Sequence, residues 1–294
     1  MEVTWLPDVE RRPRHIAVGE FDGVHAGHRE VIGSADTVLT FEPHPRMVVA
    51  PDSAPKLLTS LETKTDLIAA LGVAELVVIP FDGSFASQSP QEFIDRVLID
   101  RLGAQLVSVG ENFRFGHRAR GDAELLAAEP RFDTRVVQLV ELEGQIVSST
   151  HIRGLVSVGD VATAARFLGA PFQIRGTIAH GDKRGHTLGF PTANLVPDPQ
   201  LVVPDHGIYA CQAELEGSGR LAAAVSVGVR PTFKTGRGLL IEAFLLDFER
   251  DVYDKRLRLD FLERLRGEQR FDSAEALVEQ MHRDVEETRR IAVV

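Results

Sequence analysis

The chain has 294 residues, of which 44% are hydrophobic and 26% charged, and at about 100 to 200 residues per domain this length predicts a globular protein of two domains. Its formal net charge of −10 argues against a nucleic-acid partner, and its longest apolar run, around residues 76–80, is far shorter than the ~20 residues that span a bilayer. A single cysteine, Cys211, and a first segment without the order of a signal peptide indicate a cytoplasmic protein without intrachain disulfides.

The first half of the chain alternates strand-like and helix-like segments. Buried strands are predicted at residues 15–21, 36–41, 74–81 and 105–110, and helices at residues 60–72 and 89–103. Strands that alternate with helices form a parallel sheet, so we expect an α/β domain.

The pattern changes after about residue 154. A helix is predicted at residues 160–169, and short alternating runs follow at residues 207–215, 220–229, 239–248 and 256–266. Such runs are typical of an antiparallel barrel. Ser273 is a good cap for a last helix at residues 273–291.

A glycine-rich turn with two histidines, GEFDGVHAGH, follows the first predicted strand. Open α/β sheets bind nucleotides at this place, at the carboxyl end of a strand beside a helix amino terminus. Glycine lets the backbone approach phosphate oxygens, and His25 and His28 can donate hydrogen bonds to a phosphoryl group. A histidine pair alone fits an ordinary strand-to-helix turn equally well, so the neighbouring motifs decide between the two interpretations.

His-x-Gly-His in this position is similar to the signature of the nucleotidyltransferase superfamily, and the longer string resembles the adenylyltransferase half of bacterial bifunctional riboflavin kinase/FAD synthetase. The strings TFEPHP, VGENFRFG and SSTHIR, at residues 40–45, 109–116 and 148–153, resemble further motifs of that family in the same order. The resemblance implies a Rossmann-like nucleotidyltransferase domain with a parallel sheet and catalytic His25 and His28. It also implies nucleotide- and phosphate-binding roles for Gly19, Phe21, Asp22, Gly23, Gly27, Asn112, Arg114, Ser148, Ser149, Thr150 and Arg153.

The second half contains GTIAHGDKRGHTLGFPTANL at residues 176–195. Glycine-spaced basic residues before Pro-Thr-Ala-Asn suggest a phosphate loop, with oxygen ligands for Mg²⁺ from Thr192 and Asn194. This stretch, SVGVRPTF and the segment from residue 241 to residue 271 resemble the riboflavin kinase module, an antiparallel β-barrel with a terminal helix. The resemblance implies that Glu242 is the catalytic base and that the phosphate loop includes Gly181, Lys183, Gly185, Thr187 and Gly189.

The resemblance thus implies an adenylyltransferase domain at residues 1–156, a linker helix at 157–170 and a kinase domain at 171–294. The two expected reactions are phosphorylation of riboflavin by ATP to FMN, and adenylylation of FMN by ATP to FAD with release of pyrophosphate. Riboflavin, FMN and ATP are then the partners, Mg²⁺ the cofactor, and FMN and FAD the products. A transient oligomer is compatible with this interpretation.

Three departures from the family pattern leave alternatives open. Only eight residues, 29–36, separate His28 from the next strand, so the first helix is expected to be a stub and the chain could be a riboflavin kinase with a degenerate first domain. His186 stands where the loop commonly has arginine, which removes a permanent charge, and Asp254 replaces a frequent glycine in a turn. A flavin-binding protein without turnover is the third hypothesis, against which Glu242, Thr192 and Asn194 argue.

Overall fold

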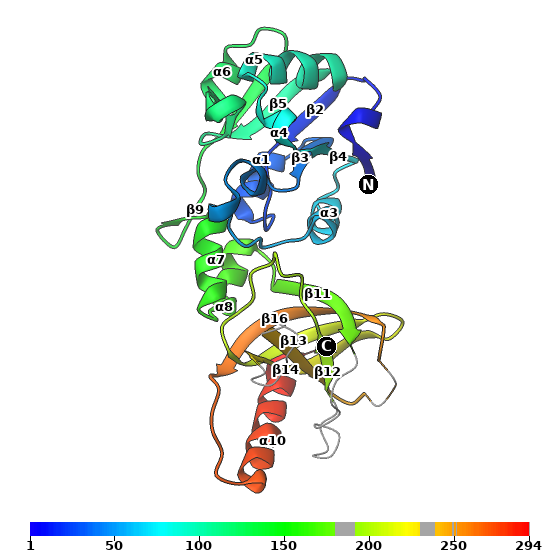
Figure 1. The fold of residues 1–294 in the computed structure, drawn as a ribbon, viewed down its shortest axis with the longest axis vertical. Coiled ribbons are helices and arrows are strands. Elements are labelled where there is room, and N and C mark those ends of the chain that lie inside the picture. Colours follow the sequence, from blue (N-terminus) through cyan, green and yellow to red (C-terminus); the bar gives the residue numbers. More distant parts are fainter. Residues whose placement is uncertain (180–191, 230–238, 249, 251, 294) are drawn as a thin grey trace. The chain divides into compact units, whose positions relative to one another are not determined.

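The computed structural model describes residues 1–179, 192–229, 239–248, 250 and 252–293, and the chain divides into two compact units, Met1–Ser149 and Thr150–Val294 (Figure 1). Each unit has its own core. Within the described ranges, no helix has both the length and the apolar sequence that crossing a membrane requires.

The first unit is built on a six-stranded sheet in the order β1-β4-β3-β2-β5-β8, in which every pair of neighbours is parallel. The strands are β1 (Glu2–Trp5), β2 (Arg14–Val18), β3 (Thr37–Glu42), β4 (Glu75–Pro80), β5 (Ala104–Gly110) and β8 (Asp133–Val137). The predicted parallel α/β unit is confirmed. Because β2 lies between β3 and β5, its carboxyl end is the switch point at which open α/β sheets bind ligands.

Helices cover both faces of this sheet (Figure 1). They are α1 (Ala26–Ile32), α2 (Pro45–Val49), α3 (Leu61–Ala69), α4 (Gly83–Ala86), α5 (Pro90–Glu92), the π-helix η3 (Phe93–Arg101) and α6 (Ala123–Ala127), with 3₁₀ turns η1 (Leu6–Asp8), η2 (Pro51–Ser53) and η4 (His117–Ala119). Two small hairpins are formed by β6 (Arg114–Phe115) with β7 (Gly121–Asp122) and by β9 (Glu141–Leu142) with β10 (Gln145–Ile146).

Alternate side chains of the strands enter two separate cores, one on each face of the sheet. Ile16 and Val18 of β2 belong to the cluster that contains Phe93 of η3, whereas Ala17 of β2 belongs to the cluster that contains Ile68 of α3. The helices that carry these residues are therefore held by apolar burial against opposite faces.

The short crossover between β2 and β3 has the predicted stub helix. Helix α1 has seven residues and ends at Gly33, whose φ of +47° is a left-handed value that favours glycine. Its buried Val31 and Ile32 still reach the core, so two turns suffice to cover this part of the sheet.

The second unit is a closed antiparallel barrel in the order β11-β12-β15-β14-β13-β16. Its elements are α7 (Ser149–Ser157), α8 (Val161–Leu168), β11 (Phe172–Ala179), β12 (Ala193–Leu195), β13 (Gly207–Leu215), β14 (Gly219–Val229), β15 (Leu239–Leu245), β16 (Arg256–Arg266) and α10 (Ala274–Ile291). The predicted barrel and terminal helix are confirmed. Helix α8 lies within the range of the predicted linker helix, and the domain boundaries themselves stay a prediction.

The amino-terminal edge of the parallel sheet is closed by a buried ion pair. Arg14, which is 1% exposed, donates to both carboxylate oxygens of Glu75, from Nε at 2.7 Å and from Nη2 at 3.0 Å, and the hydroxyl of Thr37 donates to the same carboxylate at 3.0 Å. Burial alone would raise the pKa of Glu75, but these hydrogen bonds and the charges of Arg14 and Arg12 outweigh it and lower that pKa. The three strands β2, β3 and β4 are thereby joined at their first residues.

Replacing Glu75 by glutamine is expected to lower the free energy of unfolding of the first unit by about 3 kcal/mol or more, because the buried guanidinium of Arg14 loses its counter-charge. Trp5, the single tryptophan of the chain, lies in this unit, so its fluorescence during urea unfolding reports on this unit. Glu10→Gln, an equal change at an exposed side chain, should leave the midpoint unchanged. Equal midpoints for the two variants would contradict a stabilising ion pair.

Because the pKa of Glu75 is lowered by folding, its contribution is present above the ordinary carboxyl pKa and is lost as the pH falls through the folded value. The difference between the parent protein and Glu75→Gln should therefore shrink in acid.

Candidate functional site

The two histidines lie in the turn between β2 and α1. His25 is the N-cap residue of α1, and its Nδ1 accepts a hydrogen bond from the backbone N–H of His28 at 3.2 Å. The two rings stack with their centroids 3.5 Å apart at an interplanar angle of 15°, and a Cβ atom at Gly27 would lie 3.3 Å from the ring of His25. Since Nδ1 accepts, neutral His25 carries its proton on Nε2, which makes Nε2–H a hydrogen-bond donor.

The ring of His28 is held in its neutral form. Burial, followed by the charges of His25 and Lys64, lowers the pKa of His28 well below its usual value. Its Nδ1 is shielded from solvent and has no hydrogen-bond partner among the described residues. His28 therefore offers a neutral imidazole group, which donates or accepts a hydrogen bond without adding a full charge.

The backbone of the turn adopts unusual conformations. Phe21 and Val24 have φ values of +50° and +43°, which cost energy in residues other than glycine and are typical of functional turns. The rings of Phe21 and His28 form a T-shaped contact with their centroids 5.4 Å apart, and a Cβ atom at Gly19 would lie 2.9 Å from the Phe21 ring. Gly19 thus leaves the space that Phe21 needs in order to support His28.

Asp22 and Gly23 are engaged by the chain itself. The carboxylate of Asp22 accepts hydrogen bonds from the backbone N–H groups of Leu58 and Thr59, at 2.9 and 3.0 Å, and the Gly23 N–H donates to the hydroxyl of Thr59 at 3.1 Å. The hydroxyl of Ser149 donates to the carbonyl of Asp22 at 2.9 Å. These contacts organise the turn from within, and a direct contact of Asp22 or Gly23 with nucleotide stays a prediction.

Asn112 and Arg114 follow the carboxyl end of β5, the strand beside β2, so they lie at the same edge of the sheet as the histidine turn. Both residues are exposed. The guanidinium of Arg114 lies 3.8 Å from the carboxylate of Asp122, and the rings of Phe113 and Phe115 stack with centroids 5.6 Å apart. The exposed groups could reach a ligand at this edge, while the aromatic rings anchor their segment.

The motif SSTHIR spans the boundary between the two units. Ser148 and Ser149 belong to the first unit, and Thr150 and Arg153 to the second. Arg153 Nη1 donates to the Thr150 hydroxyl at 3.4 Å, within α7. Ser149 is thus joined to the histidine turn through Asp22, and the phosphate contacts of all four residues stay a prediction.

One charged residue at this edge was missed by the sequence interpretation. Lys64 of α3 is only 6% exposed, and its ammonium donates to the hydroxyl of Thr40 in β3 at 3.4 Å. Its position four residues before the buried Ile68 places a lysine on the apolar stripe of the helix. That spacing is the signal that could have identified it.

In the second unit, the predicted base and a predicted metal ligand face each other. Asn194 of β12 pairs with Glu242 of β15, and Glu242 pairs on its other side with Ser226 of β14. The neighbours of Glu242 along β15, Ile241 and Ala243, are fully buried, so the three paired polar residues share the opposite, outer face of the barrel. The Oδ1 atom of Asn194 is shielded from solvent and has no hydrogen-bond partner in the described part of the chain.

Thr192 precedes β12 and is half-buried, two residues before Asn194. The five predicted residues of the phosphate loop lie outside the described residues, as does His186; the five are Gly181, Lys183, Gly185, Thr187 and Gly189. Their roles stay a prediction.

Comparison with known proteins distinguishes the two halves in the same way. Residues 8–151 match a family model described as FAD synthetase, and residues 168–292 match one described as riboflavin kinase. Bifunctional riboflavin kinase/FMN adenylyltransferases from Bacillus subtilis (strain 168) and Pseudomonas fluorescens are each 37% identical to this chain; the alignments cover 94% and 96% of it, and 91% and 95% of the relatives. The chain belongs to the bifunctional riboflavin kinase/FMN adenylyltransferase family.

A solved structure titled as a macrolide-efflux protein from Streptococcus pneumoniae is also similar, with 30% identity, a TM-score of 0.89, and coverage of 98% of this chain and 99% of that chain. The likeness therefore extends over nearly the whole chain.

Family membership decides among the three hypotheses. The chain is an enzyme with riboflavin kinase and FMN adenylyltransferase activities, because it carries a domain for each and its relatives are named for both. The bifunctional prediction is confirmed. Asp254, where the family frequently has glycine, has a φ of +61°, so aspartate here adopts the turn conformation that glycine favours.

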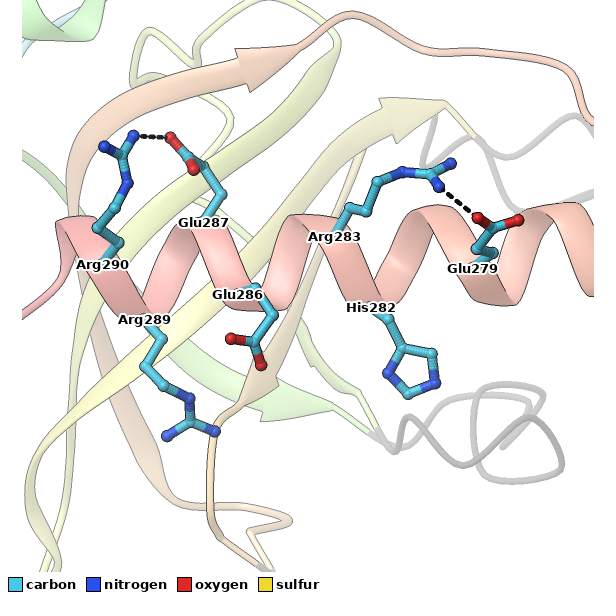
Figure 2. A pocket seen from close by; sticks show the side chains of 7 residues that line it. All are labelled: Glu279, His282, Arg283, Glu286, Glu287, Arg289 and Arg290. Atoms are coloured by element: carbon cyan, nitrogen blue, oxygen red, sulfur yellow. Dashed lines mark hydrogen bonds and ion pairs between the residues drawn. The ribbon is translucent and has the colours of Figure 1, made fainter.

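A hollow on the kinase unit is lined by residues of α10, and none of its lining residues in the described part of the chain is a predicted site residue (Figure 2). Arg283 pairs with Glu279 at 2.7 Å, and Arg290 pairs with Glu287. The negative charges of the glutamates and the positive charges of the arginines neutralise one another along the helix, which is typical of a solvated surface.

Gly19→Ala is expected to reduce FAD formation from supplied FMN by about 10- to 100-fold, because the added methyl group displaces the buried Phe21 ring and with it His28. FMN formation from riboflavin should continue, since the barrel has its own core. Gly83→Ala is the matched control, because nothing lies within 4 Å of an added Cβ atom there. Chromatographic separation of riboflavin, FMN and FAD measures both reactions, and parental FAD output from Gly19→Ala would contradict the role given to Phe21.

Proposed function

We propose that Glu242 is the general base of the kinase unit, and that His25 and His28 bind the reacting phosphates in the adenylyltransferase unit. The observation that carries this proposal is the cross-strand pair of Glu242 and Asn194, which sets a carboxylate opposite an amide oxygen that has no hydrogen-bond partner among the described residues. Proton acceptance and cation binding are the two tasks that phosphorylation of an alcohol requires.

In the kinase reaction, the 5′-hydroxyl oxygen of riboflavin forms a bond to the γ-phosphorus of ATP, and the bond from that phosphorus to ADP breaks. Glu242 accepts the hydroxyl proton as the attack proceeds. Its backbone belongs to the middle of β15, between two paired strands, so the carboxylate is presented from a rigid element. Rigid placement favours catalysis because the carboxylate is already oriented before the reaction begins.

The residues present fit Mg²⁺. Asn194 offers a buried amide oxygen and Thr192 a hydroxyl oxygen two residues earlier, and hard oxygen ligands are those that Mg²⁺ prefers. When bound, the ion would neutralise charge on the phosphates of ATP. Asn194 is held in β12 beside Glu242, so the same strand pair that orients the base would also hold the cation ligand.

In the adenylyltransferase reaction, a phosphate oxygen of FMN forms a bond to the α-phosphorus of ATP, and the bond from that phosphorus to pyrophosphate breaks. The FMN phosphate is already an anion, so no protein base is needed, and catalysis rests on orientation and on hydrogen bonds to the developing charge. His25 supplies its Nε2–H for this purpose. The ring of His28 stacks on that of His25 and makes a T-shaped contact with the ring of Phe21, which restricts the direction of its hydrogen bond.

The proposal needs only riboflavin, FMN and ATP as partners and assigns both reactions to the cytoplasm. No nucleic acid takes part in it, and a transient oligomer is compatible with it.

Glu242→Gln should reduce FMN formation by about 100- to 10,000-fold, because glutamine keeps the size of the side chain and loses the ability to accept the proton. FAD formation from supplied FMN should persist. Glu263→Gln, an exposed position on β16, is the matched control and should keep both activities. Undiminished FMN formation by Glu242→Gln would exclude this residue as the base.

His28→Ala should reduce FAD formation from FMN by about 100- to 1,000-fold, as expected when one stabilising donor is lost from a transition state. FMN should accumulate from riboflavin, because the kinase unit is unaffected. His15→Ala removes an exposed histidine of β2 in the same unit and should behave like the parent protein. If His28→Ala and His15→Ala made FAD equally well, the role of the histidine pair would be wrong.

A further inference from the structure

The imidazole of His28 brings no positive charge to the reaction assigned to the histidine turn. Lowering of the pKa of His28 leaves its imidazole neutral, and α1, with seven residues, is short. ATP and FMN together bring several negative charges to the carboxyl edge of the sheet. Charge that accumulates on the departing pyrophosphate is stabilised best by a cation fixed in advance.

Lys64 is a cation at the correct edge. It extends from α3 to the hydroxyl of Thr40, which in turn donates to the carbonyl of Glu20 at 3.1 Å. Thr40 lies near the carboxyl end of β3, and Glu20 lies two residues beyond the end of β2. The ammonium therefore lies beside the ends of the two strands that flank the α1 crossover, within electrostatic range of His28.

The hydrogen bonds of Lys64 are incomplete within the described residues. An ammonium has three donors, and here one of them makes a single long contact of 3.4 Å. Burial of an ammonium costs several kcal/mol unless its charge and its donors are compensated. Burial lowers the pKa of Lys64, and the carboxylates of Asp22, Glu42 and Glu20 oppose that change, so the charge is compensated at a distance while donors remain for a ligand.

The neighbouring segment fixes this lysine in place. Asp22 of the histidine turn accepts hydrogen bonds from the backbone of Leu58 and Thr59, just before Ser60 caps α3 through the Thr63 N–H. Helix α3 is thereby joined to the same turn that holds the histidines, so Lys64 and the histidine pair keep a constant relation.

We propose that Lys64 is a further phosphate-binding residue of the adenylyltransferase site, whose ammonium binds the phosphate chain of ATP and the pyrophosphate that leaves. This inference rests on the adenylyltransferase role proposed for the first unit. The competing interpretation is purely structural, with Lys64 as the counter-ion of Glu20, Asp22 and Glu42. The two differ in what removal of the charge does to ligands with and without phosphates.

Lys64→Met removes the charge and keeps most of the length of the side chain. With supplied FMN, its kcat/KM for ATP should fall by about 100-fold, whereas FMN formation from riboflavin should stay within about two-fold of the parent, because the barrel folds around its own core. Inhibition of FAD formation by pyrophosphate should weaken by at least about ten-fold, while inhibition by adenosine, which has no phosphate, should not change. Lys64→Arg should recover part of the pyrophosphate inhibition, since it restores a positive charge.

Lys56→Met is the matched control, because it removes the same charge from an exposed position eight residues earlier. It should keep all of these constants. Equal loss of inhibition by adenosine and by pyrophosphate in Lys64→Met would establish the structural interpretation and overturn the proposal. Parental FAD formation by Lys64→Met would overturn it as well, provided that His28→Ala is inactive; parental FAD formation by both variants would instead overturn the proposed function of the turn.

A measurement on the parent protein does not depend on how the variants fold. The chain has only five lysines, so protein labelled with ¹³C at lysine Cε gives few signals, and that of Lys64 is assigned by its absence from Lys64→Arg. Titration with pyrophosphate should shift the Lys64 signal and leave that of Lys56 in place. An unmoved Lys64 signal at saturating pyrophosphate would overturn the proposal.

Discussion

One hydrogen bond organises the adenylyltransferase site, from the backbone N–H of His28 to Nδ1 of His25. It begins α1, it selects the tautomer in which Nε2 of His25 carries the proton, and it holds the two rings close enough to stack. An ordinary N-cap from serine or aspartate would satisfy the same N–H. With histidine as the cap, the group that begins the helix is also a group that can meet the substrate.

The two ends of the parallel strands are built in opposite ways. At the amino edge, Arg14 and Glu75 satisfy each other with two hydrogen bonds, and Thr37 adds a third to the carboxylate. At the carboxyl edge, Nδ1 of His28 is without a partner among the described residues, and Lys64 makes one long contact. Buried polar groups that are fully paired stabilise a fold, whereas incompletely paired ones cost stability and are typical of places where a ligand completes the set.

The sequence predicted those helices and strands that are determined by the pattern of residues close together in the chain. Runs of valine, leucine and isoleucine between helical segments indicated the parallel sheet, and the eight residues after His28 indicated that the first helix is a stub, as α1 with its seven residues is. Motif order then indicated both activities. Tertiary contacts were not predictable in this way: the carboxylate of Asp22 binds the backbone of Leu58, 36 residues away, which no spacing rule reveals. The π-helical form of residues 93–101 was likewise hidden, because its apolar spacing is that of any buried helix.

Lys64 shows a further reason for incomplete prediction. Long charged residues on a helix are usually solvated, and only the packing of α3 against the sheet reveals that this one is enclosed. The position of Ile68 four residues later was visible in the sequence. How deeply a side chain on this apolar face of α3 is buried depends, however, on how closely the helix approaches β3. The burial of Lys64 is therefore a property of the folded unit and cannot be derived from the sequence of α3 alone.

The pairing of β12, β15 and β14 constrains how the kinase half can change. Along β15 the pleat alternates between the barrel interior, which holds Ile241 and Ala243, and the outer face, which holds Glu242. Insertion of one residue before Ile241 would turn the carboxylate of Glu242 into the apolar interior and bring Ile241 and Ala243 out. Length changes within this strand therefore remove the core and the proposed base together, whereas length changes in the connections leave both intact. Variation in this half is consequently confined to substitutions in the strands and to insertions between them.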